Sequence, residues 1–340
     1  MILIYGSYGY TGDLISRYAV ERDEDVVLAG RNGDELREQG DELGLPTRKF
    51  DADEAEANLD GVDVVLNCAG PFSRTYEPIL DACLGEGADY LDITGEIEVF
   101  RAAVGATDEA KEQGVTLMPG VGFDVVPTDC LAFHVSRRVE NPRKMEIFVE
   151  PSGKLSHGTA QTALESLGEG GWVLRDGMLK RKPIAWRTDE IEGRKGVAVP
   201  LADVVTGFYT TGVGDIDTYV LAPGVMRKAM KASRYLGKLP GRRHIKNLFS
   251  KAVERTLDGP DESHRKSENA TAWCRVVGAD RETAVSRLRT PETYRLTKLT
   301  ALESAVRADG TELEGGFKTP ASVWGADYVT EFEGVERTDL

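Results

Sequence analysis

Three glycines near the start of the chain constrain its fold more than any other feature. Gly6, Gly9 and Gly12 follow a β-rich run at residues 2–5 and open a helix-like segment at 11–22. In a dinucleotide-binding turn the first glycine permits the tight turn, the second lets the backbone approach the pyrophosphate, and the third lets helix and strand pack closely. The N–H groups at the start of such a helix then face the anion. The spacing therefore predicts a pyrophosphate-binding turn.

Strand-like and helix-like segments alternate over the first 120 residues. The strand-like runs occupy residues 2–5, 26–30, 62–70, 89–95 and 115–122. The helix-like segments lie between them at 11–22, 33–43, 74–86 and 98–113. This order is typical of a doubly wound parallel sheet, and continuously apolar runs suit strands that are buried on both faces. We therefore predict an α/β protein with an N-terminal Rossmann domain.

After residue 125 the pattern changes. The strand-like stretches KMEIFVEP, GVAVPL, DTYVLA, NATAWCRVVGA and ETAVSRLR follow at irregular spacing. Helix-like segments lie at 128–139, 158–170, 223–238, 242–256 and 291–307. This pattern favours a second, α+β domain with a mainly antiparallel sheet and helices on one face.

The last predicted helix has signals at both ends. We expect Thr290 to cap it, Pro291 to lie in its first turn, and Gly310 to follow its end. The predicted domains are an NADP-binding Rossmann domain at 1–125, a substrate or dimerisation domain at 126–290, and a C-terminal helix and tail at 291–340 that packs back on the Rossmann domain.

The chain is strongly acidic. Its 340 residues carry 57 acidic and 42 basic side chains, for a net charge of -15, and the basic residues comprise 27 arginines and 15 lysines. A nucleic-acid-binding protein is disfavoured because phosphate contacts require positive charge. An acidic, lysine-poor surface fits a halophilic host as well as an ordinary acidic cytosolic enzyme, and both interpretations stay open.

Cysteine and histidine are scarce. The four cysteines show no CxxC spacing, and none of the four histidines is spaced from another as metal ligands are, so we predict no metal site and no disulfide framework. No apolar run reaches the roughly 18 residues that a membrane-spanning helix needs. Met1 leads directly into an apolar run, without the charged segment that opens a signal peptide. We therefore expect a cytoplasmic protein.

The end of the second predicted strand indicates which cofactor binds. An NAD-specific site has Asp or Glu at this point to bind the ribose hydroxyls. This chain has Gly30-Arg31-Asn32 instead, and a guanidinium binds a phosphate through paired hydrogen bonds. We predict NADP(H) as the cofactor, with Arg31 at its 2′-phosphate and Asn32 beside it, where Asn32 also caps the next helix. The alternative is that Arg31 is a solvated residue near Asp34 and Glu35.

The ends of the other parallel strands should line the rest of the cofactor site, because ligands of such sheets bind beyond the carboxyl ends of the strands. The remaining predicted cofactor-binding residues are Tyr8, Tyr10, Thr11, Asp51, Cys68, Ala69, Gly70, Pro71, Phe72, Thr94, Gly95, Gly122 and Pro127. Tyr8 is the unusual member, since the loop favours small residues. It either covers the cofactor or lies on the surface.

Five stretches occur in an order and spacing that resemble a known family. They are GSYGYTG, LAGRN, NCAGPF, DYLDITGE and GVGFDVVPTD. The chain resembles the saccharopine dehydrogenase-like oxidoreductases, in particular the branch that contains the trans-acting enoyl reductases of lipid biosynthesis. The stretches VTGFYTTGVGDIDTY and GGFKTPASVWG are also similar to segments of that branch. At Ser7-Tyr8 the chain departs from the family, which usually has smaller residues there.

The resemblance implies an NADP(H)-binding Rossmann domain and a mixed α+β domain that covers the nicotinamide. Members of this family act either on the C–N bond of an amino-acid adduct or on the C=C bond of an acyl chain. Saccharopine chemistry needs basic residues for several carboxylates, yet residues 67–76, 92–98 and 119–130 contain Arg74 as their only basic residue. This favours an NADPH-dependent reductase of a C=C bond in an acyl or isoprenoid lipid. The alternatives are an oxidoreductase of a C–N bond and a non-catalytic NADP(H)-binding sensor or scaffold.

Hydride transfer to an alkene or imine needs a side chain that protonates or polarises the product. Glu96 follows a strand end and either faces the substrate or starts a helix, where the helix dipole favours a carboxylate. Asp124 and Asp129 are each either catalytic or a helix cap, and His157, which titrates near neutrality, is either catalytic or a cap. The candidate catalytic residues are Tyr76, Glu96, Asp124, Asp129 and His157.

A basic stretch interrupts the acidic chain. Residues 224–255 contain ten Lys or Arg and a single acid, Glu254. Ile245, Leu248 and Phe249 fall on one face of a predicted helix beside these charges. Such a segment either binds an anionic membrane surface or an acidic carrier protein, or is a solvated face whose charges pair with acids elsewhere.

Overall fold

The computed structural model describes residues 1–152, 171–222, 224, 227–228, 230–231 and 269–340. His157, the helices expected at 158–170 and 242–256, and most of the basic stretch at 224–255 lie outside these residues. The described chain forms two compact units. One comprises Met1–Val126 with Tyr294–Val323, and the other comprises Pro127–Thr293 with Trp324–Leu340.

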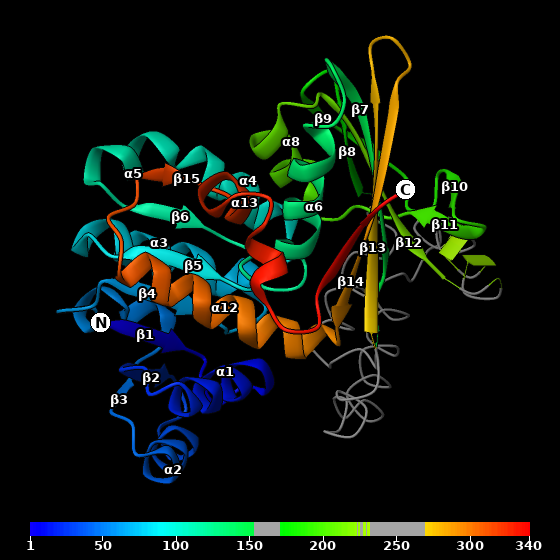
Figure 1. Cartoon of the computed structure of the whole chain (residues 1–340). Coiled ribbons are helices and arrows are strands. Elements are labelled where there is room, and N and C mark those ends of the chain that lie inside the picture. Colours follow the sequence, from blue (N-terminus) through cyan, green and yellow to red (C-terminus); the bar gives the residue numbers. More distant parts are fainter. Residues whose placement is uncertain (153–170, 223, 225–226, 229, 232–268) are drawn as a thin grey trace, which may run out of the picture. The chain divides into compact units, whose positions relative to one another are not determined.

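The first unit is built around a seven-stranded sheet whose neighbouring strands are all parallel. The strand order is β15-β6-β5-β4-β1-β2-β3, which is the Rossmann order extended at one edge by β15. Figure 1 shows these strands as a stack with β15 at its upper edge and β3 at its lower edge. The strands are β1 (Ile2–Tyr5), β2 (Val26–Gly30), β3 (Thr47–Lys49), β4 (Val64–Asn67), β5 (Asp89–Asp92), β6 (Thr116–Met118) and β15 (Gly316–Phe317).

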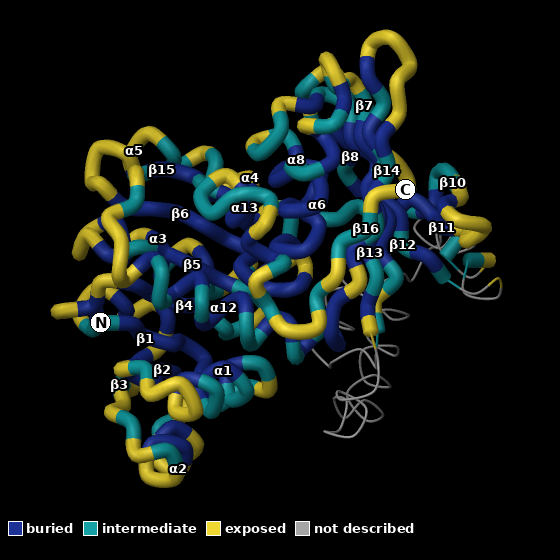
Figure 2. Tube along the Cα trace, in the orientation of Figure 1, coloured by how far each residue is buried: buried dark blue, intermediate teal, exposed yellow. Residues whose placement is uncertain are grey.

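Helices connect the strands and cover the sheet of this unit. They are α1 (Tyr10–Glu21), α2 (Gly33–Leu43), α3 (Phe72–Glu86), α4 (Ile97–Gly105), α5 (Thr107–Gln113), α12 (Thr293–Asp309) and α13 (Pro320–Trp324), with the short 3-10 turns η1 (Ala52–Glu54) and η2 (Glu56–Asn58). Every residue of β1, β2, β4 and β6 is buried, as continuously apolar runs predict for strands covered on both faces. Figure 2 shows these strands in dark blue along the centre of the unit. The predicted α/β fold with a Rossmann domain is confirmed.

Three details of the first unit differ from the expectation. The helix expected at 98–113 is two helices, because α4 ends at Gly105, a residue with low helix propensity. The strand β3 was expected only through the placement of Asp51 at a strand end, and no range was predicted for it, since its sequence TRK is polar and largely exposed at the edge of the sheet. The strand β15 has only two residues, too few for a periodic pattern.

The second unit is built around a nine-stranded sheet. Its main path runs β10-β11-β12-β7-β13-β14-β16, while β8 pairs with β12 and with β9. All of these pairs are antiparallel except β12 with β7, which agrees with the mainly antiparallel sheet that we predicted. The strands are β7 (Pro142–Glu150), β8 (Gly171–Arg175), β9 (Met178–Lys182), β10 (Thr188–Ile191), β11 (Arg194–Ala198), β12 (Asp215–Leu221), β13 (Asn269–Gly278), β14 (Thr283–Pro291) and β16 (Glu336–Asp339).

The helices of the second unit include α6 (Val126–Ser136), α8 (Asp203–Thr211) and the turn η3 (Tyr328–Glu331). The sequence did not indicate α8, whose TGFYTT segment is poor in strong helix formers. The expected cap at Thr290 and first turn at Pro291 are wrong. Residue Pro291 is still in β14, opposite Asn269, and α12 begins at Thr293. The residue before a proline favours extended backbone, which lets the strand continue.

Candidate cofactor and active site

The glycine turn joins β1 to α1. Gly6 adopts a φ of +77°, in the left-handed region, and its N–H donates to the Ala29 carbonyl of β2 at 2.8 Å. The N–H of Gly9 donates to the Gly6 carbonyl at 3.1 Å. A Cβ on Gly12 would lie 2.2 Å from the Gly6 carbonyl oxygen, so a larger residue would displace the turn. This cradle fits a pyrophosphate placed at the start of α1.

Ser7 is held by α2. Its hydroxyl donates to Gln39 Oε1 at 2.8 Å, and Gln39 Nε2 donates to the Ser7 carbonyl at 2.9 Å and to Asp13 Oδ1 at 3.1 Å. Ser7 is completely buried and Gln39 nearly so. The polar side chain of Ser7 therefore points away from solvent and fixes the turn, and Gln39 is a residue of the site that the sequence did not reveal.

Tyr8 packs over the end of β2. A Cβ on Gly30 would lie 2.5 Å from Tyr8 Cε1, so the ring occupies the space where a side chain would otherwise stand. The Tyr8 hydroxyl accepts a hydrogen bond from the Asn32 N–H at 3.0 Å. The side chain that looked out of place in the sequence thus joins the pyrophosphate turn to the turn between β2 and α2.

Arg31 and Asp51 lie just beyond β2 and β3. Both are exposed, and Arg31 forms no ion pair with any other described residue. Asp51 caps η1 by accepting the Ala52 N–H at 2.7 Å.

Burial, followed by the charge of Asp51, raises the pKa of Tyr5 to about 12. Asn32 caps α2, as predicted, through its Oδ1 and the N–H of Asp34 at 3.2 Å.

Asn67 organises the loop that follows β4. Its Oδ1 accepts the Ala69 N–H at 3.0 Å, and its Nδ2 donates to the Thr75 hydroxyl oxygen at 3.2 Å. The Thr75 hydroxyl in turn donates to the Ala69 carbonyl at 2.7 Å. A Cβ on Gly6 would lie 2.8 Å from the Cβ of Ala69, so this loop and the glycine turn are in contact.

Glu96 caps α3 from a different part of the chain. Its Oε1 accepts the Phe72 N–H at 3.1 Å and its Oε2 accepts the Ser73 N–H at 3.0 Å. The Glu96 N–H donates to the Thr94 hydroxyl oxygen at 3.0 Å. Both carboxylate oxygens thus accept hydrogen bonds from N–H groups that have no partner within the helix. The helix dipole also favours a negative charge at this end.

Asp92 connects the ends of β5 and β6. It is fully buried; its Oδ1 accepts the N–H groups of Thr94 and Gly120, each at 2.9 Å, and its Oδ2 accepts the Tyr90 hydroxyl at 2.8 Å. Desolvation outweighs these three donors and raises the pKa of Asp92 to about 7. Asp92 is a further residue of this region that was not predicted, although an aspartate at the end of an apolar strand is a signal for such a role.

Asp124 lies in the loop that follows β6. A Cβ on Gly95 would lie 2.9 Å from Asp124 Oδ2, and the adjacent Phe123 N–H donates to the Thr297 hydroxyl oxygen of α12 at 3.1 Å. The Asp124 side chain is solvent-exposed, and its carboxyl has no hydrogen-bond or ion-pair partner among the described residues. The protein around it nevertheless desolvates the charged form and raises the pKa to about 6. An accessible but weakly hydrated carboxyl has the properties of a proton donor near neutral pH.

The two other described catalytic candidates are buried. Tyr76 on α3 packs edge-on against Tyr90, with ring centroids 5.3 Å apart, and its hydroxyl has no hydrogen-bond partner among the described residues. Burial raises the pKa of Tyr76. In the second unit, Asp129 on α6 accepts a hydrogen bond from the Thr210 hydroxyl of α8. Neither side chain has the accessibility of Asp124.

The remaining predicted residues have diverse surroundings. Tyr10 is exposed and packs edge-on against Tyr294 at 5.0 Å between centroids, and Thr11 lies in the first turn of α1. Cys68 is partly buried, and desolvation raises the pKa of its thiol. In the first unit, Gly6, Arg31, Ala69, Gly95 and Asp124 all follow neighbouring parallel strands, and the carboxyl ends of such strands share one edge of the sheet. The peptide bond between Gly70 and Pro71 is cis, Gly122 lies against Thr297, and Pro127 lies in α6 of the second unit.

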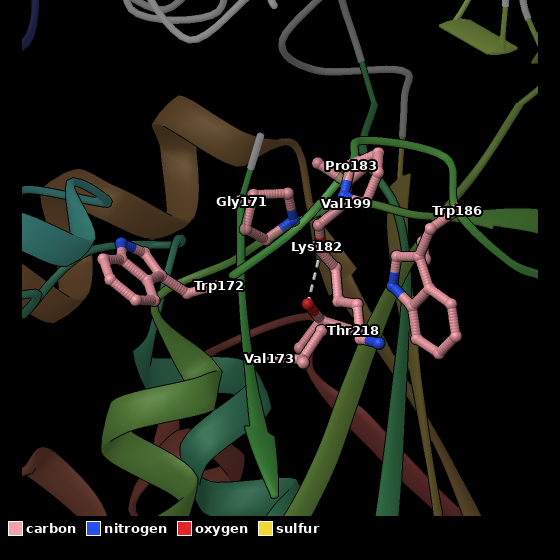
Figure 3. Close-up of a pocket in the computed structure, with 10 residues that line it drawn as sticks. Gly171, Trp172, Val173, Lys182, Pro183, Trp186, Val199 and Thr218 are labelled. Atoms are coloured by element: carbon pink, nitrogen blue, oxygen red, sulfur yellow. Dashed lines mark hydrogen bonds between the residues drawn. The ribbon is translucent and has the colours of Figure 1, made fainter. Parts of the chain in front are cut away.

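Other candidate sites in the described chain are few. Figure 3 shows a small hollow in the second unit, with Trp172 and Trp186 on opposite sides of Lys182 and Thr218. It contains none of the predicted site residues.

The described residues include no group of three or more His, Cys, Asp or Glu side chains that could hold a metal ion. They also include no helix with the length and apolar character needed to span a bilayer.

Part of the chain is similar to known proteins. Residues 2–118 match the family model of the saccharopine dehydrogenase NADP binding domain. A trans-acting enoyl reductase of Mycobacterium ulcerans is 32% identical over 148 residues, which cover 40% of this chain and 35% of the enoyl reductase. A lipid droplet localized protein of Caenorhabditis elegans is 28% identical over 239 residues, which cover 58% of this chain and 55% of that protein. The chain therefore spans about a third to a half of the length of these curated relatives.

A solved structure resembles the whole chain. Saccharopine dehydrogenase (L-Glu forming) of Saccharomyces cerevisiae has a TM-score of 0.66 at 12% sequence identity, over 100% of this chain and 99% of the yeast protein. At this identity the likeness concerns the fold alone. The family model identifies the cofactor of the first unit as NADP, in agreement with the prediction from the sequence. The resemblance drawn from the sequence motifs is thus confirmed over residues 2–118, which match the saccharopine dehydrogenase NADP binding domain.

Proposed function

We propose that this chain is an NADPH-dependent reductase of a C=C bond in an acyl or isoprenoid lipid, with Asp124 as the proton donor. The observation that carries this proposal is the Asp124 carboxyl, which is exposed, lies against Gly95 at the end of the parallel sheet, and has a pKa of about 6. The residues that precede it, 2–118, match the NADP-binding domain of an oxidoreductase family.

The residues of the first unit fit the cofactor. At Gly6 and Gly12 there is no room for a Cβ atom. A glycine turn of this kind lets the backbone come close to a pyrophosphate. The exposed guanidinium of Arg31 is available for the 2′-phosphate, because no described carboxylate pairs with it. When bound, NADPH supplies a hydride.

Reduction of an activated C=C bond also consumes one proton. Asp124 keeps a substantial protonated fraction near neutral pH because its pKa is raised to about 6. Since the side chain is exposed, it can recover a proton from solvent after each turnover. Glu96, Tyr76 and Asp129 are less suited to this role, because each is buried or fully engaged in hydrogen bonds.

The proposed substrate class rests on what surrounds the nicotinamide end of the site. Residues 67–76, 92–98 and 119–130 contain Arg74 as their single basic residue, too few for a substrate with several carboxylates. The names of the relatives, trans-acting enoyl reductase and lipid droplet localized protein, point in the same direction. The proposed contact of residues 224–255 with an anionic membrane surface or an acidic carrier protein, and a homodimer, stay predictions.

The test is NADPH oxidation by the full chain. Unsaturated acyl thioesters and isoprenoid lipids are compared with amine and keto-acid pairs as substrates. We expect oxidation with an alkene, and Asp124→Asn should lower the rate about a hundredfold or more while leaving NADPH affinity unchanged. The rate of the wild type should fall as the pH rises above about 6, because the proton leaves Asp124.

A matched control is Asp280→Asn, which changes an exposed aspartate in the turn between β13 and β14 and should leave the rate unchanged. Oxidation by amine and keto acid together, with no response to any alkene, would contradict the proposed substrate class and favour the C–N alternative. Full activity of Asp124→Asn would remove Asp124 from the mechanism. NADPH binding without turnover of any substrate would favour a sensor or scaffold.

A further inference from the structure

Two cations flank the turn between β2 and α2. Lys49 on β3 lies directly opposite Gly30 in the parallel register of β2 and β3. A Cβ on Gly33 would lie 2.8 Å from Lys49 Cδ and 3.6 Å from its Nζ, so the lysine stem runs over the start of α2. Arg31 belongs to the same turn and lies two residues before Gly33 in the sequence. Both side chains are exposed, and neither pairs with a carboxylate among the described residues.

Among the described residues these two cations have no carboxylate partner, although the net charge of the chain is -15. Other basic side chains of the first unit pair with carboxylates. Arg17 pairs with Glu42, Arg37 with Asp34, and Lys318 with Glu314. Two cations without a described carboxylate partner at the end of β2 therefore suit an anionic group of a ligand.

The geometry of Tyr8 fixes the turn between these cations. Its ring fills the space over Gly30, which any side chain at that position would otherwise occupy. Its hydroxyl accepts the Asn32 N–H at 3.0 Å, directly after Arg31. The backbone on either side of Arg31 is thus attached to one tyrosine, and this tyrosine replaces the small residue expected in such a loop.

We propose that Tyr8 is a positioning residue, which holds the β2–α2 turn so that Arg31 and Lys49 bind the 2′-phosphate of NADPH from two sides. The inference rests on the proposed function in so far as NADPH is the cofactor, and it adds Lys49 as a residue that selects NADPH over NADH. The hydroxyl of Tyr8 acts through Asn32, and its ring acts through Gly30.

The experiment is titration of the full chain with NADPH and with NADH. Tyr8→Phe keeps the ring and removes the hydrogen bond to Asn32. We expect about fivefold weaker NADPH binding and unchanged NADH binding, because one hydrogen bond contributes roughly 1 kcal/mol. Arg31→Ala and Lys49→Ala should each weaken NADPH binding about tenfold or more, again without an effect on NADH.

A double variant separates positioning from general stability. If Tyr8 acts by placing Arg31, Tyr8→Phe should change NADPH affinity by less than about twofold when Arg31 is already alanine, since coupled residues are not additive. The control is Lys318→Ala, which removes a cation beside β15, at the opposite edge of the same sheet, and should change neither affinity.

The inference is overturned if Tyr8→Phe leaves NADPH binding unchanged, or weakens NADPH and NADH equally, or adds its full effect to that of Arg31→Ala. A Lys49→Ala variant with the wild-type preference for NADPH would remove Lys49 from the site. These outcomes differ from a failure of the proposed function, in which the wild type itself binds no NADPH or prefers NADH.

Discussion

Ser7 and Gln39 hold each other through two buried hydrogen bonds. The Ser7 hydroxyl donates to Gln39 Oε1 at 2.8 Å, and Gln39 Nε2 donates back to the Ser7 carbonyl at 2.9 Å. The two residues are 32 positions apart, in the glycine turn and in α2. The shape of the pyrophosphate turn therefore depends on a neighbouring helix as well as on its own glycines.

Gln39→Ala should destabilise the first unit and weaken NADPH binding together. The variant leaves the buried Ser7 hydroxyl without its acceptor and the Ser7 carbonyl without its donor, which should cost about 1–3 kcal/mol in free energy of unfolding. Urea unfolding and an NADPH titration measure the two effects. The exposed Gln113→Ala is the control and should change neither. Wild-type NADPH affinity in Gln39→Ala would contradict a role for Gln39 in shaping the turn.

Glycine substitutions should separate the crowded turn from open positions. Gly12→Ala places a Cβ 2.2 Å from the Gly6 carbonyl oxygen, so the turn must move and NADPH binding should be lost or weakened by more than about tenfold. Gly85→Ala meets nothing within 4 Å in the helix α3 and should stabilise the protein by about 0.5–1 kcal/mol. Thermal unfolding and cofactor titration of both variants provide the measurement. Normal NADPH binding by Gly12→Ala would show that the turn is not the pyrophosphate site.

Glu96→Ala should affect stability more than chemistry. The variant leaves the Phe72 and Ser73 N–H groups at the start of α3 without their acceptor, which should cost about 1–2 kcal/mol. The turnover rate should fall less than about tenfold, compared with a hundredfold or more for loss of a proton donor. Glu98→Ala, at an exposed position on α4, is the matched control and should lower stability only slightly. A wild-type free energy of unfolding combined with a collapse of turnover would reverse the assignment of Glu96 as a cap.

Asp92 should make stability depend on pH. Its pKa is raised from 3.8 to about 7 in the folded chain, so the folded state binds more protons than the unfolded state between these values. Stability from this group is therefore present below pH 3.8 and is lost as the pH rises towards about 7. Asp92→Asn cannot titrate, and Tyr90 can turn to accept a hydrogen bond from the amide.

The measurement for Asp92 is the free energy of unfolding of the wild type and of Asp92→Asn at about pH 5 and about pH 8. The advantage of the wild type over the variant should shrink as the pH rises. A difference that stays constant between the two pH values would mean that Asp92 is ionised throughout.

The sequence was most informative where one local rule decides the structure. Gly6 and Gly12 carry the turn because no Cβ fits there, and the apolar runs of β1, β2 and β4 indicate strands buried on both faces. Asn32 was predicted as a cap because Glu35 follows three residues later, and its Oδ1 accepts the N–H of Asp34. Such features can be recognised from the neighbouring residues of the sequence alone.

Contacts between residues far apart in the chain could not be predicted from the sequence in this way. Gln39 lies on a polar, mostly exposed helix, and its burial against Ser7 depends on how that helix packs. Glu96 is at the start of α4, so a helix-start carboxylate was a reasonable alternative, but the N–H groups that it binds belong to α3, 23 and 24 positions earlier. Asp124 was one of five candidates in the sequence, and its exposure and raised pKa, on which the proposed role as proton donor rests, depend on the folded structure.

Discrimination between NADPH and NADH tests the central claim most directly. The wild-type chain is titrated with each dinucleotide at the same ionic strength, because phosphate contacts weaken with salt. An NADP-binding domain in which Arg31 follows β2 and pairs with no described carboxylate should bind NADPH at least about tenfold more tightly than NADH, a difference of about 1.4 kcal/mol. Equal affinities, or tighter binding of NADH, would contradict the NADPH-dependent function.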